Sequence, residues 1–309
     1  MQTEAVLLTA PGKLGVETLH TASPGDGDIV VEVSHSGIST GTEKLIWSGK
    51  MPAFPGLGYP LVPGYEATGT VVEAGRDSAL APGARVFVPG STAWAQARGI
   101  FGAAARHLVT DARRATPLDP GLGEAGTLLA LAATAHHAIA AAPPGLVIGH
   151  GTLGRLIARI TTALGHPPPV VHETAPARRD APADYAVLDP EDDTRRDYAV
   201  ICDASGDAAV LDTAVARLSR GGEVVLAGFY PRRIGLAFAP AFMKEARLRI
   251  AAEWTPADMA AVTRLIDMGR LSLDGLITHR APASDAPAAY ERAFAGGDCL
   301  KMVLDWRPA

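Results

Sequence analysis

The chain has 309 residues, a length that predicts two domains or one large one. Its composition of 48% hydrophobic and 20% charged residues is typical of a folded protein and excludes extensive disorder. Its formal net charge of −5 provides no basic excess with which to bind nucleic acid or an anionic membrane surface. Cys202 and Cys299 are its two cysteines, too few for a disulfide scaffold or a four-cysteine zinc lobe, and they fit a reducing, cytoplasmic compartment.

The first third of the chain predicts a β-rich domain. Pro-Gly pairs such as Pro63-Gly64 and Pro82-Gly83 separate short β-branched runs, a pattern that is typical of strands joined by tight turns. The strands predicted here are Ala5–Leu8, Asp28–Ser34, Ala67–Ala74 and Arg85–Pro89. We therefore expect a barrel-like or sandwich-like domain.

The pattern changes near Leu118, where helices are expected to begin. We predict a helix from Gly123 to Ala141, and residues 125–154 contain no Asp, Glu, Lys or Arg. Because this stretch is rich in alanine and is interrupted by Pro143-Pro144, we interpret it as a buried helix and a buried strand, and expect no integral membrane span. Residues 1–8 also lack the basic and apolar regions of a signal peptide.

Strands and helices then alternate, which indicates βαβ units around a parallel sheet and thus an α/β fold. The predicted strands are Leu146–Ile148, Pro169–Glu173, Ala183–Leu188, Tyr198–Asp203, Gly222–Gly228 and Leu248–Ala252. The helices expected between them are Leu153–Leu164, Leu211–Leu218 and Asp258–Met268. The last part predicts a strand, a helix and a strand, at Leu276–His279, Ala286–Ala295 and Leu300–Trp306.

Residues 149–154, Gly-His-Gly-Thr-Leu-Gly, fit the dinucleotide-binding pattern G-x-G-x-x-G between a predicted strand and a predicted helix. The first glycine permits the tight turn, the second lets the backbone approach a pyrophosphate, and the third allows close helix–strand packing. The helix N-terminus then favours the phosphates. The cofactor-binding residues predicted in this loop are Gly149, His150, Gly151, Thr152, Leu153 and Gly154; for His150 we expect the backbone to matter more than the imidazole, although the ring could touch phosphate.

Glu173 is the acidic residue expected after the second strand of such a unit. It lies 173 − 154 = 19 residues after the last glycine and closes the predicted strand Pro169–Glu173. Its carboxylate could accept the ribose hydroxyls and would repel a 2′-phosphate, which favours NAD over NADP. Arg178 and Arg179 follow closely and could serve a 2′-phosphate, so NADP stays open.

The whole chain resembles the medium-chain dehydrogenase/reductase superfamily. Residues 63–75, Pro-Gly-Tyr-Glu-Ala-Thr-Gly-Thr-Val-Val-Glu-Ala-Gly, are similar to its P-G-H-E-x-x-G-x-V-x-x-x-G segment, and residues 82–86 to its G-D-R-V turn. Residues 204–206 and 221–228 are similar to its later cofactor-domain strands, which implies cofactor contacts for Ser205 and Gly228. The resemblance implies a GroES-like catalytic domain over 1–118, completed by about 270–309, and a Rossmann domain with a doubly wound parallel sheet over 119–269.

Within this superfamily, the chain resembles the bacteriochlorophyllide dehydrogenase family more closely. The segments that carry this likeness are residues 36–49, Ser-Gly-Ile-Ser-Thr-Gly-Thr-Glu-Lys-Leu-Ile-Trp-Ser-Gly, and residues 227–230, 251–254 and 299–306. The resemblance implies oxidation of the 3-(1-hydroxyethyl) group of a magnesium bacteriochlorophyllide to acetyl, in bacteriochlorophyll a synthesis, with NAD as hydride acceptor. It thus implies a small-molecule tetrapyrrole substrate, and because members of the superfamily often form dimers or tetramers, a homo-oligomer stays open.

Catalytic zinc in this superfamily is bound by a cysteine, the histidine of G-H-E and a third ligand. The resemblance places Ser39 or Thr40 at the cysteine position and Tyr65 at the histidine position. A hydroxyl and a phenol are poor replacements for a thiolate and an imidazole. Glu43 and Glu66 remain as oxygen donors, but without a nitrogen or sulfur donor we expect no catalytic zinc.

Without zinc, a side chain or a water relay must take the proton of the alcohol. Tyr65 is the leading candidate because it occupies the vacated ligand position. A phenol titrates near about pH 10, so it would need a nearby cation, for which we propose Lys44. Glu43 could instead be the base or could orient Thr40, whereas Glu66 is expected to hold the loop. A space-filling role for Tyr65 stays open.

A flat, apolar tetrapyrrole needs a wide, aromatic-lined cleft. The aromatic residues in segments that could line one are Trp47, Phe54, Tyr59, Trp94, Phe229 and Tyr230. Each could equally be an ordinary packing residue. Two other functions stay open: a zinc-free quinone or enone reductase that uses NADPH, and an NAD-binding subunit without catalytic activity.

Overall fold

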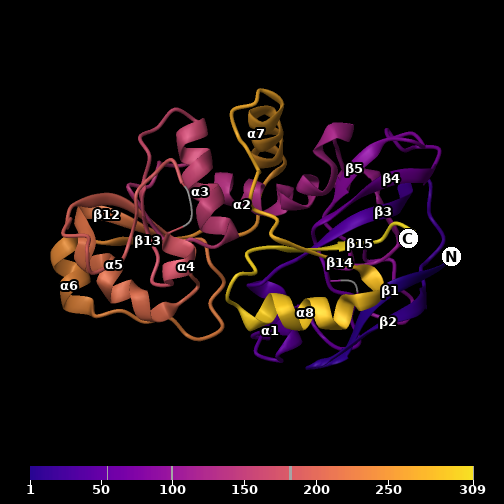
Figure 1. The fold of residues 1–309 in the computed structure, drawn as a ribbon, viewed down its shortest axis with the longest axis horizontal. Coiled ribbons are helices and arrows are strands. Elements are labelled where there is room, and N and C mark those ends of the chain that lie inside the picture. Colours follow the sequence, from indigo (N-terminus) through magenta and orange to yellow (C-terminus); the bar gives the residue numbers. More distant parts are fainter. Residues whose placement is uncertain (54, 99, 181–182, 309) are drawn as a thin grey trace. The chain divides into compact units, whose positions relative to one another are not determined.

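The computed structural model describes residues 1–53, 55–98, 100–180 and 183–308, and it divides into two compact units (Figure 1). The first unit comprises Met1–Leu129 and Leu273–Ala309, and the second comprises Ala130–Ser272. The first boundary falls later than the expected residue 118, because the 3₁₀ segment η2 (Pro120–Leu128) packs on strands of the first unit.

The main sheet of the first unit has the strand order β14-β15-β3-β4-β5-β7, with β6 beside β3. These strands are β3 (Asp28–Ile38), β4 (Ala67–Ala74), β5 (Arg85–Val88), β6 (His107–Asp111), β7 (Thr116–Pro117), β14 (His279–Pro282) and β15 (Met302–Asp305). β15 runs antiparallel to β3, with Leu304 opposite Ser36, so the C-terminal segment completes this sheet. β1 (Gln2–Ala10) and β2 (Lys13–His20) form a separate antiparallel pair.

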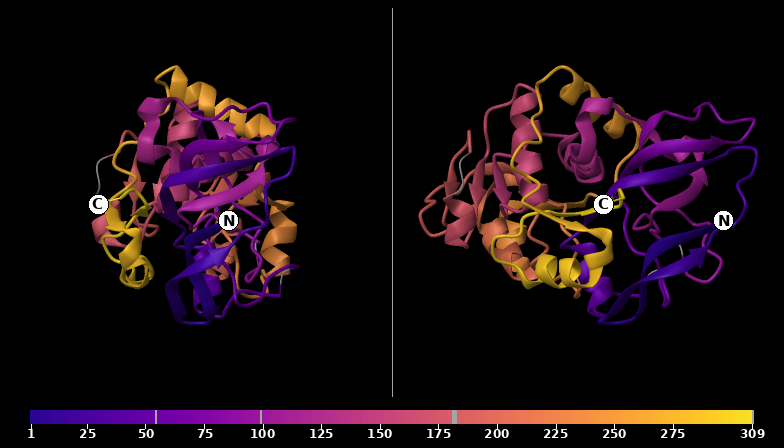
Figure 2. Two further views of the ribbon diagram at one scale, coloured as in Figure 1. Left: turned by 90° about the vertical axis from the view of Figure 1, so that its right-hand side faces the viewer. Right: turned by 45° about the vertical axis from the view of Figure 1, so that its right-hand side comes forward.

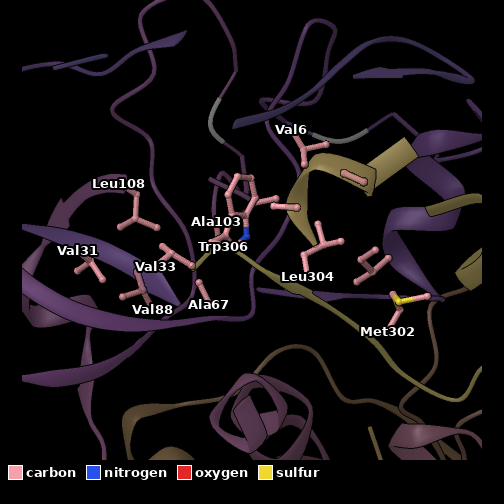
Figure 3. Packing of buried hydrophobic residues seen from close by; sticks show 14 of the residues in the cluster. Val6, Val31, Val33, Ala67, Val88, Ala103, Leu108, Met302, Leu304 and Trp306 are labelled. Atoms are coloured by element: carbon pink, nitrogen blue, oxygen red, sulfur yellow. The ribbon is translucent and has the colours of Figure 1, made fainter. Parts of the chain in front are cut away.

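The core of the first unit forms because alternate side chains of these strands are apolar and face the same side. Val31 and Val33 of β3 lie in one buried cluster with Leu304 and Trp306, as the close view in Figure 3 shows. The Trp306 indole N–H donates to Ser36 Oγ at 2.8 Å, which fastens the end of the chain to β3. The helices of this unit are α1 (Thr42–Trp47) and α8 (Ala286–Ala295), with 3₁₀ turns at Ala112–Arg114 and Ala283–Asp285.

The second unit contains a parallel sheet of order β10-β9-β8-β11-β12-β13. Its strands are β8 (Leu146–Ile148), β9 (Val170–His172), β10 (Val187–Leu188), β11 (Tyr198–Asp203), β12 (Leu218–Leu226) and β13 (Arg247–Ile250). Its helices are α2 (Leu129–Ile139), α3 (Thr152–Ala163), α4 (Pro176–Arg179), α5 (Leu211–Arg217), α6 (Phe238–Lys244) and α7 (Pro256–Asp267), with a 3₁₀ turn at Ala208–Val210. The strand order reverses between β8 and β11, which confirms the doubly wound fold.

Helices cover the sheet of the second unit: α3 packs on β8, and α5 and α6 pack on β12 (Figure 2). Within the described ranges, no helix is long and apolar enough to cross a membrane. In an open parallel sheet, a ligand binds beyond the carboxyl ends of the strands where their order reverses. This point of the second unit is the loop of residues 149–154, which follows β8.

The predicted elements differ from the structure in several places, and the strand expected at Ala183–Leu188 is only Val187–Leu188. The helix expected over Gly123–Ala141 is interrupted, because Gly123 adopts a φ of 52°, and the regular helix ends at Ile139. The strand expected at Leu276–His279 begins only at His279; just before it, the Thr278 hydroxyl accepts the Leu300 backbone N–H. The short helices α1 and α6 and the strands β2 and β6 were not predicted, since their few residues carry no clear period.

Candidate functional site

The glycine-rich loop lies between β8 and α3, in the context that the motif requires. Gly149 adopts a φ of 97°, which glycine tolerates best. A Cβ on Gly154 would lie 1.8 Å from the Gly149 carbonyl oxygen, whereas a Cβ on Gly151 would meet nothing within 4 Å. Gly151 therefore leaves space beside the backbone for a ligand. α3 begins at Thr152 without a side-chain cap, so its positive end is directed to the loop.

Glu173 follows β9 and joins the loop to the next turn. Its Oε2 accepts the His150 backbone N–H at 3.1 Å, and its Oε1 accepts the Ala175 N–H at 2.9 Å. Each carboxylate oxygen keeps a second lone pair, with which it could accept a ribose hydroxyl. These residues fit the adenosine side of a nicotinamide dinucleotide.

The two arginines near Glu173 differ in availability. Arg179 donates to Asp189 Oδ2 at 2.6 Å and to the Glu173 carbonyl at 3.2 Å, so its guanidinium is engaged within the protein. Arg178 forms no ion pair with any carboxylate in the described part of the chain. Arg178 therefore remains the candidate for a 2′-phosphate contact.

Ser205 and Gly228 follow the neighbouring strands β11 and β12. The Ser205 N–H and hydroxyl donate to Asp203 Oδ1 at 2.8 and 2.6 Å, and the Tyr230 hydroxyl donates to the other oxygen of Asp203. Burial raises the pKa of the Asp203 carboxyl. A Cβ on Gly149 would lie 3.2 Å from the Ser205 nitrogen, so the turn after β11 lies beside the glycine-rich loop.

In the first unit, the turn between β3 and α1 brings Ser39 and Glu43 together, and Tyr65, which precedes β4, contacts Ser39 there. The Tyr65 hydroxyl donates to Ser39 Oγ at 2.7 Å, and the Ser39 backbone N–H donates to Glu43 Oε1 at 3.2 Å. The Thr42 side chain acts on the same phenol and partly offsets the rise of its pKa. We call Ser39, Thr42 and Tyr65 the hydroxyl cluster. Thr40, expected in this role, is exposed, because α1 begins at Thr42.

Two residues of the C-terminal segment support this cluster. Tyr290 of α8 donates to Glu43 Oε2 at 2.9 Å, and the Lys301 ammonium forms a buried ion pair with Glu66. Sequence analysis missed both, because they lie 247 and 235 residues from their partners. A lysine within the apolar run Cys-Leu-Lys-Met-Val-Leu was the available signal for a buried, paired charge.

Electrostatics at the hydroxyl cluster differ from the expectation. Burial, reinforced by the Glu66 carboxylate, raises the pKa of Glu43 to about 8. Burial and the same carboxylate raise the pKa of the Tyr65 phenol, so it stays protonated and donates its hydrogen bond. Lys44, the cation expected to lower that pKa, is exposed and forms no ion pair with the described residues. The prediction that Lys44 lowers the pKa of Tyr65 is therefore wrong.

We expect the buried carboxyl of Glu43 to make folding pH-dependent. Its pKa is about 8 in the folded chain against an ordinary 4.5, so the unfolded chain loses this proton first and the free energy of unfolding falls as pH rises between these values. Glu66, whose pKa burial also raises, acts in the same direction. Glu43→Gln should flatten the fall of Tm between about pH 5 and about pH 8, whereas Glu17→Gln, at an exposed site, should not. Equal slopes in Glu43→Gln and the wild type would contradict this.

The aromatic residues expected to line a substrate cleft have different surroundings. Trp47 packs on Phe294 with ring centroids 5.5 Å apart, and the Tyr59 hydroxyl donates to the Ile46 carbonyl at 2.6 Å. Trp94 is only 7% exposed and its indole N–H donates to the Gly102 carbonyl, so it is a core residue and its predicted substrate contact is wrong.

The remaining aromatic predictions lie elsewhere. Phe229 is exposed beyond β12, and Tyr230 beside it is engaged by Asp203. The prediction for Phe54 falls outside the described residues.

The donors at the expected zinc position do not fit that metal. Ser39 and Tyr65 bond to each other, and Glu66 is paired with Lys301. A hydroxyl and a phenol of raised pKa give up their protons reluctantly, whereas zinc requires thiolate, imidazole or free carboxylate ligands. Within the residues that the structure describes, no group of three or more His, Cys, Asp or Glu is placed to hold a metal ion.

Known proteins match the first unit of this chain and also its whole length. The family model of the alcohol dehydrogenase GroES-like domain matches residues 25–120. Two curated relatives carry the name 2-desacetyl-2-hydroxyethyl bacteriochlorophyllide A dehydrogenase. The one from Cereibacter sphaeroides is 58% identical over 99% of both chains, and the one from Rhodobacter capsulatus is 56% identical over 100% of both. An Escherichia coli alcohol dehydrogenase solved with NADH shares the fold, with a TM-score of 0.83 at 20% identity over 98% of this chain and 99% of that one.

Proposed function

Because this chain belongs to the family of the bacteriochlorophyllide dehydrogenases, within the medium-chain dehydrogenase/reductase superfamily, we propose that it oxidises the 3-(1-hydroxyethyl) group of a magnesium bacteriochlorophyllide to a 3-acetyl group. NAD is the proposed hydride acceptor, and no zinc takes part. The observation that carries this proposal is the 58% identity over 99% of the chain to a relative named for that substrate.

The cofactor supplies a nicotinamide ring that accepts the hydride from the carbinol carbon. The backbone of residues 149–154 and the N-terminus of α3 would hold its pyrophosphate. Glu173 would accept the adenosine ribose hydroxyls and repel a 2′-phosphate, which supports NAD over NADP. Arg178, which no carboxylate of the described residues neutralises, is the feature that favours the phosphorylated cofactor.

The hydroxyl cluster is the proposed route for the proton. Oxidation removes a hydride from the carbinol carbon and a proton from its oxygen, and the chain must handle the second. Tyr65 would take the substrate proton as it gives its own to Ser39 Oγ, 2.7 Å away, and the hydroxyls would pass a proton on to water. The buried carboxyl of Glu43 holds the Ser39 backbone in place for this transfer.

Turnover tests this function and separates its alternatives. The purified full chain is incubated with 3-(1-hydroxyethyl) bacteriochlorophyllide a and either NAD or NADP, and acetyl product and reduced cofactor are measured. We expect stoichiometric product and NADH, with a lower kcat/KM for NADP. Absence of product with both cofactors would contradict the proposal. Reduction of quinones or enones with NADPH would then favour a quinone or enone reductase. Binding of NADH without turnover of any alcohol would favour an NAD-binding subunit without catalytic activity.

An exposed apolar surface on the second unit supports a homo-oligomer. We call it the β13 surface; its residues, between 39% and 76% exposed, are Phe238, Phe242, Met243, Leu248 and Ile250. β13 ends the sheet and pairs only with β12 among the described strands, so its outer N–H and C=O groups lack strand partners. A strand of another chain can form hydrogen bonds with these backbone groups, whereas a lipid surface cannot. We infer that a second copy pairs along β13, about a two-fold axis.

Ile250→Lys should convert the protein from a dimer to a monomer, because it places a charge in the centre of the β13 surface. Analytical ultracentrifugation of the wild type and the variant measures this. Val72→Lys is the matched control, since Val72 is an exposed apolar residue of the first unit and its replacement should leave the dimer intact. A monomeric wild type, or an Ile250→Lys variant that sediments as the wild type does, would contradict the pairing.

A further inference from the structure

His150, in the glycine-rich loop, forms a hydrogen bond through each of its four polar atoms. Its backbone N–H donates to Glu173 at 3.1 Å, and its carbonyl accepts the Arg155 Nε–H at 3.1 Å. Its ring Nδ1 lies 2.8 Å from the Arg178 carbonyl, and its Nε2 lies 3.0 Å from the Tyr185 hydroxyl. The side chain is fully buried and is directed to these two partners, not to a phosphate.

The partners determine the direction of each ring hydrogen bond. A carbonyl oxygen only accepts, so Nδ1 carries the hydrogen and donates to Arg178. Burial lowers the pKa of His150, so the ring is neutral and Nε2 accepts the hydrogen of Tyr185. The rings of His150 and Tyr185 also meet edge to face, with centroids 5.6 Å apart. Only one tautomer satisfies both bonds, so the ring has one defined arrangement.

These bonds hold the chain that follows β9 against the loop. The Arg178 carbonyl belongs to α4, which begins shortly after Glu173, and Arg155 Nη2 approaches the same carbonyl at 3.5 Å. Tyr185 lies just before β10, the next strand of the sheet. The ring of His150 therefore ties the glycine-rich loop to α4 and to Tyr185, just before β10. We call His150, Arg178 and Tyr185 the His150 clamp.

We propose that His150 is a positioning residue for the adenosine half of the cofactor, acting through the clamp. This inference rests on the proposed nicotinamide cofactor. Glu173 and α4 lie where the adenosine ribose would bind, and the clamp fixes both before a cofactor arrives. A site that is already ordered loses less conformational entropy when its ligand binds, so the ligand binds more tightly. The nicotinamide half makes no use of this segment, so its binding should not depend on the clamp.

The test compares a complete with a truncated cofactor. Binding of NADH and of reduced nicotinamide mononucleotide, which lacks the adenosine half, is measured by fluorescence titration of the full chain without tetrapyrrole. His150→Ala removes two hydrogen bonds and should raise the Kd for NADH about tenfold. Tyr185→Phe removes one and should raise it about threefold. His150→Asn keeps a donor for the Arg178 carbonyl and should match Tyr185→Phe. All three should leave the mononucleotide Kd unchanged.

Two controls keep the result interpretable. His166→Ala removes an exposed histidine of the same unit and should bind NADH as the wild type does. Thermal unfolding of each variant identifies any loss of folding, and Tyr185→Phe, which removes a single hydroxyl, carries the test if His150→Ala does not fold.

The outcomes separate this inference from the proposed function. Wild-type affinity for NADH in both His150→Ala and Tyr185→Phe would overturn the clamp, as would an equal loss of affinity for NADH and for the mononucleotide. A wild type that binds NADH with the predicted dependence on the clamp, but does not oxidise the hydroxyethyl substrate, would overturn the function alone. A wild type that binds neither NADH nor NADPH would overturn both.

Discussion

Replacing Tyr65 by phenylalanine is expected to lower kcat for oxidation of the hydroxyethyl substrate by about 10²–10⁴-fold, the usual contribution of a positioned proton-transfer group. The variant removes the hydroxyl that donates to Ser39 Oγ. Its ring keeps the contact with Phe101, whose centroid lies 5.4 Å away, so we expect the fold to survive. Steady-state kinetics at saturating substrate and NAD measure the effect.

Tyr59→Phe is the matched control for this loss. Tyr59 is also partly buried in the first unit, but its hydroxyl donates to the Ile46 carbonyl and takes no part in the hydroxyl cluster. Removing it should cost about 1 kcal/mol of stability and leave kcat within about twofold of the wild type. Similar values of kcat for Tyr65→Phe and Tyr59→Phe would show that Tyr65 only fills space.

Replacing Lys301 by methionine is expected to lower the free energy of unfolding by about 3–5 kcal/mol, because it leaves the Glu66 carboxyl buried without a cation. Glu66 is 0% exposed and Lys301 1% exposed, and Glu66 Oε1 has no hydrogen-bond partner in the part of the chain that the structure describes. The carboxyl must then remain ionised without compensation or take up a proton that it would release in water. Urea unfolding measures the loss.

Two further variants test this reading of the ion pair. Lys44→Met removes an exposed lysine near the same site and should change stability by no more than about 0.5 kcal/mol. The double variant Lys301→Met/Glu66→Gln removes the isolated charge and should recover part of the stability that Lys301→Met loses. A Lys301→Met protein as stable as Lys44→Met would contradict a structural role for the pair.

The cofactor side of the molecule was largely predictable, because its signals are local. The strand, the six-residue glycine motif and the helix into which it runs lie consecutively in the chain, and the glycines at 149 and 154 meet local steric requirements that any such turn imposes. The alternation of strands and helices likewise predicted the parallel sheet of the second unit. The side chain of His150 was less predictable, since its ring partners lie 28 and 35 residues away.

The hydroxyl cluster was predicted only in part, because register and distant contacts decide it. Tyr65 and Glu43 were identified, but Thr40, which was also expected here, is exposed, since the chain turns before α1 begins. Lys44 is near in sequence, yet it is exposed. The lysine that neutralises a carboxylate here is Lys301, which reaches Glu66 only because β15 pairs with β3. No local pattern contains that pairing.

Turnover by metal-depleted protein decides whether hydroxyl groups or a metal ion handle the substrate proton. The full chain is dialysed against a strong chelator, its metal content is determined by mass spectrometry, and oxidation of 3-(1-hydroxyethyl) bacteriochlorophyllide a by NAD is then measured. We expect far less than one bound zinc per chain and an unchanged kcat. Loss of activity on chelation that added Zn²⁺ restores would show instead that the reaction depends on a metal ion.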